Sequence, residues 1–487
     1  MKREHNKRSA RISPKKIKIN KGGEGLTAQA GLIPVVKFFH NLNLAGIIKE
    51  TVDHQRGGTA LYDVVDAIFL PLVAIIGGAR SIRAIVTIWS DSIPCRVAGW
   101  LTIPDETTFG RLFRTFSQRH IADIEVLNHR LRGRVWHKAL RAGTSTVSVT
   151  PCKIIDVDST EKTVYGSQEG AAKGYNPHKR GSVSYHPLLA FCVETKEILQ
   201  GWLRSGNAYT SNGIVEFTKQ LLAHLPNRTR ILFRGDSGFF VGSLFDFLDA
   251  GGHGYLVKVK LKGLAKLLRG QQWEPVPGEA GWEQCLFFHR CSTWSTVRLF
   301  VAVRQEKPID PAKPSTLFEM KEYDYFCYVT TDNDNPWAAH KQYGQRATCE
   351  TWIEEAKNQT ALAHIKTDDF WANSVLFQSA ILAYNTMRWM ALLSGNKVLH
   401  RWEPGTIRTF LIRMAAKFTT GSRQQKLTVP ERMLYSPQWE AWVAAGNNRP
   451  SRFSPGNMHL NCLRGLVRHV PWKNSLAWQI HVARWAK

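Results

Sequence analysis

Acidic residues are scarce in this chain. Its 487 residues include 39 Asp and Glu against 65 Lys and Arg, which leaves a net charge of +26. A cationic excess of this size indicates a polyanionic partner. We expect nucleic acid rather than a membrane surface, because neither a basic amphipathic helix nor a lipidation motif is evident. Binding to such a partner should weaken steeply with salt.

Paired cysteines and long apolar runs are also lacking. The eight cysteines are scattered, which favours reduced thiols in a cytosolic protein over a disulfide framework. Cys285, His289 and Cys291 supply only three metal-ligand candidates, at a spacing that does not match zinc sites. The longest apolar run, Ala67–Ile76, contains Pro71 and is too short to cross a bilayer. With no signal peptide evident, the sequence predicts no membrane attachment.

The chain does contain an unusual charged segment, YGQRATCETWIEEAK at 343–357. Good helix formers fill it, and the helical period would bring one aromatic hydroxyl, two cations and two carboxylates onto one face: Tyr343, Arg346, Glu350, Glu354 and Lys357. Trp352 and Ile353 lie off this stripe and could pack the helix down. The pattern fits a catalytic face, but it also fits a solvated helix supported by ion pairs.

Two further acids follow apolar runs upstream. In KIIDVDST at 153–160, isoleucines beside Asp156 and Asp158 predict a buried strand that delivers a carboxylate at its end. The segment RILFRGDSGFF at 230–240 repeats this arrangement, with Asp236 in a glycine-flanked turn. Ligands bind at the carboxyl ends of strands in α/β sheets, although an Asp in this position is also a common cap or turn residue.

Together these three segments resemble the DDE transposases of bacterial insertion sequences, in particular the cut-and-paste group with the signature Y-x2-R-x3-E-x6-K. Four residues meet that signature without a gap: Tyr343, Arg346, Glu350 and Lys357. The pattern around the family's first acid matches Asp158 with Ser159 and Thr160, and the strand-end second acid matches Asp236. The resemblance covers roughly residues 25–430.

The resemblance implies an α/β protein with a ribonuclease H-like catalytic core that cuts and joins DNA. Its catalytic residues would be Asp158, Asp236 and Glu350, which would also ligate two Mg²⁺ ions, with Mn²⁺ as a substitute. Carboxylate oxygens suit these hard cations, and two ions can activate the attacking oxygen and stabilise the leaving oxygen of a phosphodiester. The other signature residues would contact phosphates or the cut end of the DNA: Tyr343, Arg346 and Lys357.

Periodicity alone leaves two choices open. Glu354 shares the predicted stripe with Glu350, and Asp156 would point to the same side of a strand as Asp158. The resemblance selects Glu350 and Asp158 as ligands, with Asp156 as a neighbour that tunes the site.

The amino-terminal part of the chain divides into two regions. Residues 1–25 form a basic arm, which we expect to be disordered until it meets DNA. Residues 26–144 read as a helical DNA-binding domain. There Asp105 would cap a short helix that turns Arg111 and Arg114 toward a DNA groove. A small helical bundle with a solvated basic face is the alternative interpretation.

The catalytic core is predicted over residues 145–260 and 338–392. It would begin with an antiparallel meander of strands, continue through the strand before Asp236, and end with a long amphipathic helix over 369–392. A basic loop runs from Lys173 to Arg180 soon after the first acid. Both cations would help to clamp a DNA strand, or the loop is a simple exposed turn.

Residues 261–337 read as a mainly β insertion, because the helical rhythm stops between the second and third acids. This region contains three candidate platforms for a base extruded from the duplex: Trp273, Trp282 and Trp294. Of these, we expect Trp294 to contact DNA. Hydrophobic packing is the alternative role for these rings. Residues 393–487 read as an α-rich region with a helix over 406–416, a hairpin over 418–429 and a Trp-rich basic tail.

We therefore predict a transposase that binds the terminal inverted repeats of its own mobile element. It would cut DNA with the help of metal ions and transfer strands, and the resemblance implies that the freed element ends pass through hairpins. The expected partners are double-stranded element ends, target DNA and a second copy of the chain, in a bacterial cytoplasm at the nucleoid. Two alternatives remain: a nuclease or resolvase that cuts without joining, and a catalytically inactive DNA-binding protein.

Overall fold

The computed structural model describes residues 17–143, 152–174, 179–307, 322–331, 335–364 and 367–447. Several predictions lie outside these residues. They concern most of the basic arm, the start of the first core strand, the middle of the basic loop, part of the predicted insertion and the carboxyl-terminal tail.

The amino-terminal region folds into helices, as predicted. They are α1 (Leu32–Asn41), α2 (Leu44–Thr51), α3 (Val64–Gly77), α4 (Ile82–Trp89), α5 (Ser92–Ala98), α6 (Glu106–Phe113) and α7 (Gln118–Arg141). Asp105 caps α6, and its Oδ1 accepts a hydrogen bond of 2.7 Å from the Thr108 N–H. Among the described residues, no single helix is long and apolar enough to cross a membrane, although the sharply bent pair of α3 and α4 meets the length and composition test together.

A nine-stranded mixed sheet carries the acids. In spatial order its strands are β10 (Glu274–Pro275), β11 (Trp282–His289), β12 (Arg298–Glu306), β13 (Tyr323–Thr330), β9 (Gly254–Lys258), β8 (Arg230–Gly235), β2 (Cys152–Ser159), β6 (Leu188–Cys192) and β7 (Ile198–Trp202). The antiparallel meander β2, β6 and β7 agrees with the prediction. β8 runs parallel to both β2 and β9, so the carboxyl ends of β2 and β8 meet at one edge.

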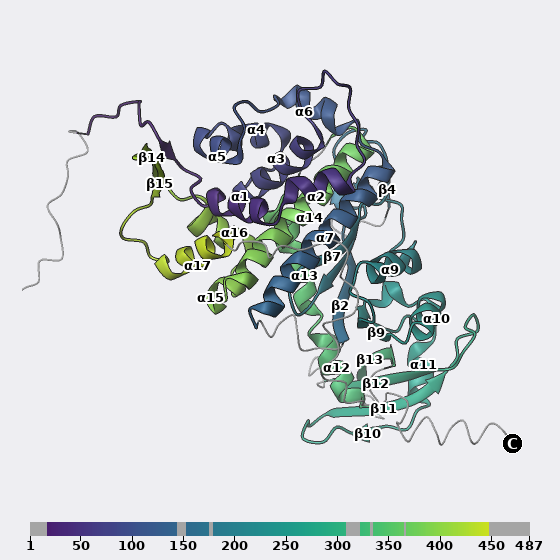
Figure 1. The fold of residues 1–487 in the computed structure, drawn as a ribbon. Coiled ribbons are helices and arrows are strands. Elements are labelled where there is room, and N and C mark those ends of the chain that lie inside the picture. The colour runs from purple at the N-terminus through teal and green to yellow at the C-terminus, as the bar shows by residue number, and fades with distance from the viewer. Residues whose placement is uncertain are drawn as a thin grey trace, which may run out of the picture. The chain divides into compact units, whose positions relative to one another are not determined.

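The strands of the predicted insertion extend this same sheet. β13 pairs antiparallel with β9, and β12 and β11 follow outward from it. Figure 1 shows these strands continuing from β9 toward β10. Between β7 and β10 the chain also forms three α-helices: α9 (Ile214–Ala223), α10 (Gly242–Ala250) and α11 (Leu264–Arg269).

Helix α14 (Phe370–Leu393) is the central helix of the structure. Asp369 caps it by accepting a hydrogen bond of 2.7 Å from the Ala372 N–H. The predicted amphipathic character of this helix is wrong, because every residue from Ala372 to Leu392 is buried. The helix contacts α3 and α7, strand β7, and helix α17 (Ser436–Asn447), and Figure 1 shows α7 running beside it.

The buried carboxylate of Glu197 forms hydrogen bonds that connect α7, α14 and the sheet. Glu197, which directly precedes β7, is 0% exposed. It accepts hydrogen bonds from the Trp136 indole at 2.6 Å, the Trp389 indole at 2.7 Å and the Arg132 guanidinium at 3.2 Å. The charge is tolerated inside the protein because it is paired and its oxygens are satisfied.

The chain after α14 contains less helix than predicted. α15 (Lys397–Arg401) and α16 (Pro404–Ile407) precede a single π-helical turn at Arg408–Ile412, where a longer helix was expected. The buried Arg408 guanidinium donates to the backbone carbonyls of Ile75 and Ile76 in α3. The predicted hairpin is present as β14 (Ala416–Gly421) and β15 (Gln424–Thr428), and β14 also pairs with β1 (Leu26–Thr27).

Candidate active site

Asp158 and Asp236 lie on neighbouring parallel strands. The register of β2 and β8 places Val157 opposite Gly235, so the next residue on each strand path is an acid. Adjacent strands are about 4.8 Å apart. The two backbones therefore hold these carboxylates side by side at one edge of the sheet, as the sequence predicted.

The environment of these acids raises the proton affinity of Asp158. Burial raises the pKa of Asp158 to about 6, the Arg346 guanidinium opposes this rise, and the Asp236 charge adds to it. The Ser159 N–H donates to Asp158 Oδ1 at 2.8 Å, and the Gly238 N–H donates to Asp236 Oδ1 at 2.9 Å. Two neighbouring carboxylates that repel each other make a setting that favours a bound cation.

The charged segment is not one continuous helix. It forms α12 (Pro336–Gly344) and α13 (Ala347–Gln359), with a break at Gln345 and Arg346. The prediction of one uninterrupted helix is therefore wrong, although Gln345 and Arg346 at the break keep helical backbone dihedral angles. Trp352 and Ile353 are buried and pack α13 down, as predicted.

Arg346, which lies at this break, reaches into the site. Its side chain is 6% exposed, and one terminal nitrogen lies 2.9 Å from Asp158 Oδ2. The same nitrogen donates to the backbone carbonyl of Val157 at 3.3 Å. Arg346 thus forms an ion pair with the first acid in this structure, and its predicted contact with a DNA phosphate stays a prediction.

Tyr343 lies within the field of all three predicted acids. Burial raises the pKa of Tyr343 to about 12; Arg346 opposes this rise, and the charges of Asp236, Asp158 and Glu350 contribute to it. Its ring packs on Tyr328, with ring centroids 4.6 Å apart. Glu350 is exposed in the first turn of α13. Tyr343 therefore lies between the strand-end acids and the start of α13, where the third acid is found.

Lys357 contacts the segment that follows the first acid. Its ammonium nitrogen lies 2.9 Å from the Thr160 hydroxyl oxygen, to which it donates a hydrogen bond. This bond links α13 to the end of β2. An ammonium has three donors, so Lys357 keeps capacity for a phosphate, and its DNA contact also stays a prediction.

Asp156 is engaged elsewhere. Arg234 donates two hydrogen bonds to its carboxylate oxygens, and both side chains are 0% exposed. This ion pair favours Asp158 over Asp156 as the ligand. Glu354, the alternative to Glu350, is exposed on α13.

Sequence reasoning missed a loop that borders the acids. The Arg204 guanidinium, in a residue 9% exposed, donates to one carbonyl on the neighbouring strand segment, that of His186, at 3.0 Å. It also donates to three carbonyls of the loop: those of Tyr209, Thr210 and Asn212. One arginine therefore fixes the conformation of the chain that follows β7.

The ordered loop reaches the first acid. The Thr210 hydroxyl lies 3.2 Å from the hydroxyl of Ser159, the residue after Asp158. Tyr209, beside it in the chain, is 76% exposed. The only signal in the sequence is an arginine at a strand end before a polar loop, which is too common a pattern to identify such a role.

Four other candidate DNA contacts lie on the surface. Arg111 is exposed on α6, and Arg114 forms an exposed ion pair of 2.7 Å with Asp368. Lys173 in β4 (Ala172–Lys173) and Arg180 are also exposed. Exposure is necessary for phosphate contacts, and DNA binding by these residues stays a prediction.

Trp294 is mostly inaccessible in this structure. It is 8% exposed and packs against three phenylalanine rings: Phe240, Phe245 and Phe300. The Arg298 guanidinium lies 4.9 Å from its ring centroid. Hydrophobic packing, the alternative considered for the three tryptophans, describes this ring, because too little of it reaches solvent to stack an extruded base.

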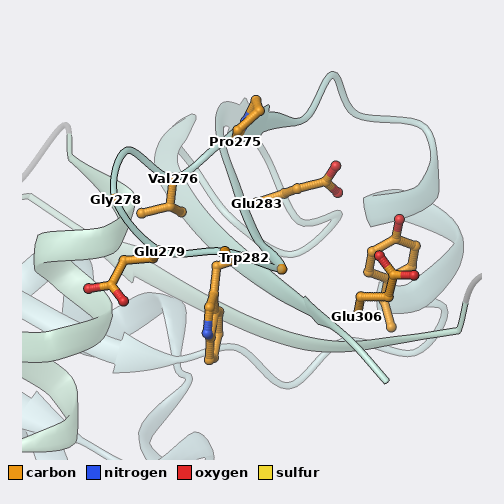
Figure 2. A pocket seen from close by; sticks show the side chains of 10 residues that line it. Pro275, Val276, Gly278, Glu279, Trp282, Glu283 and Glu306 are labelled. Carbon is orange, nitrogen blue, oxygen red and sulfur yellow. The ribbon is translucent and has the colours of Figure 1, made fainter. Parts of the chain in front are cut away.

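A cavity of about 490 Å³ lies at the far end of the same sheet. Figure 2 shows the three acidic residues and one of the aromatic residues that line it: Glu279, Glu283, Glu306 and Trp282. Lys341 pairs with Glu279 at 3.1 Å, and Arg304 pairs with Glu283 at 2.5 Å. Among the described residues, these acids are not grouped closely enough to hold a metal ion.

The carboxylates at the sheet edge suit a divalent cation in kind. Asp158, Asp236 and Glu350 offer only oxygen donors, the donors that Mg²⁺ prefers. Among the residues that the structure describes, however, no three His, Cys, Asp or Glu side chains are grouped closely enough to hold an ion. Arg346 occupies Oδ2 of Asp158. These side chains would therefore have to move before all three could hold one cation.

Comparison with known proteins identifies the family. The family model described as "Transposase DDE domain group 1" matches residues 9–445. No curated protein matches the chain. A similar solved structure is a piggyBac transposase synaptic complex with hairpin DNA, with a TM-score of 0.41 and 14% identity over 79% of this chain and 80% of that one. From the family match, the chain is a member of the DDE transposases.

Proposed function

We propose that this transposase binds the terminal inverted repeats of its own mobile element, cuts the DNA there and joins the freed ends to a target. The observation that carries the proposal is the in-register placement of Asp158 and Asp236 at the ends of β2 and β8. Glu350 acts with them as the third acid. The order β9, β8, β2, β6, β7, with β2, β6 and β7 antiparallel and β8 and β9 parallel to β2, supports a ribonuclease H-like core.

Asp158, Asp236 and Glu350 would hold two Mg²⁺ ions, or Mn²⁺ in their place. When bound, such ions activate the attacking oxygen and stabilise the leaving oxygen of a phosphodiester. All three acids fit these cations by their donor atoms, and Asp158 and Asp236 also do so by their placement at neighbouring strand ends. The release of element ends through hairpins belongs to this proposal as well.

The neighbouring side chains of the site bind and orient the DNA. Arg346, which contacts Asp158, and Lys357, which contacts Thr160, offer positive charge to phosphates. With a pKa near 12, Tyr343 keeps its proton at neutral pH. It therefore acts as a hydrogen-bond donor to a phosphate oxygen and not as a nucleophile.

The proposal also covers the DNA partners and the oligomeric state of the protein. The net charge of +26 fits binding of element ends and target DNA through their phosphates. Because two ends are cut together, the enzyme works as a homodimer. Its location is the bacterial cytoplasm at the nucleoid.

The direct test is cleavage of a duplex that carries the inverted repeat flanking this gene. Wild type should cut it only when Mg²⁺ is present, whereas Asp236→Asn should bind the duplex and fail to cut. Joined products from a labelled 3′ end distinguish a transposase from a nuclease or resolvase that only cuts. Cutting retained by Asp236→Asn would reject the assignment, and absence of cutting by wild type would favour an inactive DNA-binding protein.

A further inference from the structure

We infer that Arg346 keeps the cation away from Asp158 until a DNA phosphate draws the guanidinium off. DNA binding and metal binding would then be coupled through one side chain. This inference rests on the proposed function, because it takes DNA and a divalent cation as the two ligands of the site.

The geometry places a positive charge where the cation would bind. The Arg346 guanidinium lies 2.9 Å from Asp158 Oδ2, and the two side chains are only 6% and 16% exposed. At contact distance and away from water, two cations repel each other strongly. Arg346 therefore competes with a dication for the same carboxylate.

The guanidinium is poorly satisfied in its present position. Among the described residues, its Nε has no hydrogen-bond partner although it is buried. Its bond to the Val157 carbonyl is long, at 3.3 Å. A phosphate can accept two parallel hydrogen bonds from the planar guanidinium, so a DNA backbone offers Arg346 better partners than the protein does.

The acids explain why the two events support each other. If Arg346 moved away and no cation took its place, Asp158 and its neighbour Asp236 would lose their counter-charge in a partly buried site, which is unfavourable. A dication that enters as Arg346 leaves restores the charge balance. DNA therefore removes the positive charge that opposes cation binding, and the cation removes the unpaired negative charge that opposes the departure of Arg346. Thermodynamic reciprocity requires the same coupling factor in both directions.

The position of Arg346 suits this exchange. It lies in the break between α12 and α13, and the third acid, Glu350, follows in the first turn of α13. The residues that bind the phosphate and the cation are thus held by the same short segment.

The test measures Mn²⁺ affinity without DNA, by electron paramagnetic resonance of free Mn²⁺, in wild type and in Arg346→Gln. We expect Arg346→Gln to bind Mn²⁺ at least about tenfold more tightly than wild type, a coupling within the usual range for linked sites. Asp158→Asn in the Arg346→Gln background should remove this gain. Arg304→Gln, which breaks an ion pair with Glu283 elsewhere in the sheet, should leave the affinity unchanged.

A second arm adds a short blunt duplex, with Mn²⁺ bound by the duplex alone subtracted. Wild type should then gain Mn²⁺ affinity, and Arg346→Gln should show little further gain. Equal DNA-free affinity in wild type and Arg346→Gln would overturn the inference, as would full DNA-dependent tightening in Arg346→Gln. If Arg346→Gln does not fold, Arg346→Lys replaces it. Because this variant loses the planar fork, its Mn²⁺ affinity without DNA should lie between that of wild type and the value expected for Arg346→Gln. An unchanged Mn²⁺ affinity would contradict the inference.

The outcomes separate this inference from the function on which it rests. Mn²⁺ bound at Asp158 regardless of Arg346 would leave the proposed function intact and reject the coupling alone. Absence of any Asp158-dependent Mn²⁺ binding, with or without duplex, would reject the metal-dependent function itself.

Discussion

The Arg234 guanidinium donates hydrogen bonds of 2.6 and 2.8 Å to the two carboxylate oxygens of Asp156, and neither side chain is exposed to solvent. These residues lie on neighbouring strands, two positions before Asp236 and Asp158. The pair therefore fixes the lateral placement of the two acids that follow it.

Loss of this arginine should destabilise the protein. Arg234→Met leaves Asp156 buried and unpaired, so the free energy of unfolding should fall by about 3–5 kcal/mol. Urea titration followed by fluorescence measures the change. Arg83→Met removes an ion pair with Glu106 that is largely exposed and should cost less than about 1 kcal/mol; equal losses in the two variants would contradict our account.

The buried carboxyl group of Glu125 should make stability depend on pH. Burial raises the pKa of Glu125 from 4.5 to about 7, against an opposing hydrogen bond from Gln200. The folded protein thus binds this proton more tightly than the unfolded chain does. The resulting stabilisation is complete below pH 4.5 and is lost as the pH rises to about 7.

Glu125→Gln removes this dependence. The variant should match wild type near pH 4 and exceed its free energy of unfolding by about 2–3 kcal/mol near pH 8. Urea titrations at several pH values measure the difference. Glu216→Gln, at a residue whose side chain is 56% exposed, serves as the control, and a Glu125→Gln profile parallel to that of wild type would show that Glu125 is not desolvated as the structure indicates.

The loop held by Arg204 should loosen when that side chain is shortened. Arg204→Lys keeps the charge but cannot reach three loop carbonyls with a planar fork. Amide hydrogen exchange over residues 205–213 should therefore become faster. DNA cleavage should fall more than DNA binding does, because the Thr210 hydroxyl would lose its contact with the Ser159 hydroxyl, which lies next to Asp158. Unchanged exchange in this loop would mean that other contacts, such as the His186 bond to the Ala208 carbonyl, are enough to order it.

Helix α6 provides a test of DNA recognition by the amino-terminal helices. If Arg111 contacts a phosphate, Arg111→Ala should weaken DNA binding and reduce the slope of log affinity against log salt by about 1. Fluorescence anisotropy at several salt concentrations gives this slope. Lys219→Ala removes an exposed cation on α9 and should change the slope less, so equal effects would indicate general charge attraction without a specific role for α6.

The strand-end acids could be predicted from the sequence because local signals agreed. Apolar runs before Asp158 and Asp236 favour buried strands, and the glycines around Asp236 favour a turn directly afterwards. Asp105 was predictable as a cap for the same reason, since capping depends on residues a few positions away. Short-range patterns thus locate the strand-end acids, whereas the choice of Asp158 over Asp156 and of Glu350 over Glu354 came from the family resemblance.

Other features depend on partners that are distant in the chain. The break before α13 contains no proline, and Arg346 adopts its position through Asp158, far away in sequence. The burial of Trp294 depends on Phe240 and Phe300, which no local pattern connects. Likewise, α14 has polar residues such as Asn385 that suggest an exposed face, but Asn385 accepts from the Ile198 N–H and donates to its carbonyl.

The burial of α14 on every side limits how the protein can be divided. Its neighbours include α3 and α7 from the first part of the chain, β7 from the middle and α17 from the last described part. A fragment cut at the apparent borders between these regions would remove one of the elements that cover α14, and tryptophan and leucine side chains of α14 would become exposed to water. Dissection into independently soluble pieces should therefore fail, and grafting new end recognition onto this enzyme would have to preserve the whole surface that surrounds that one helix.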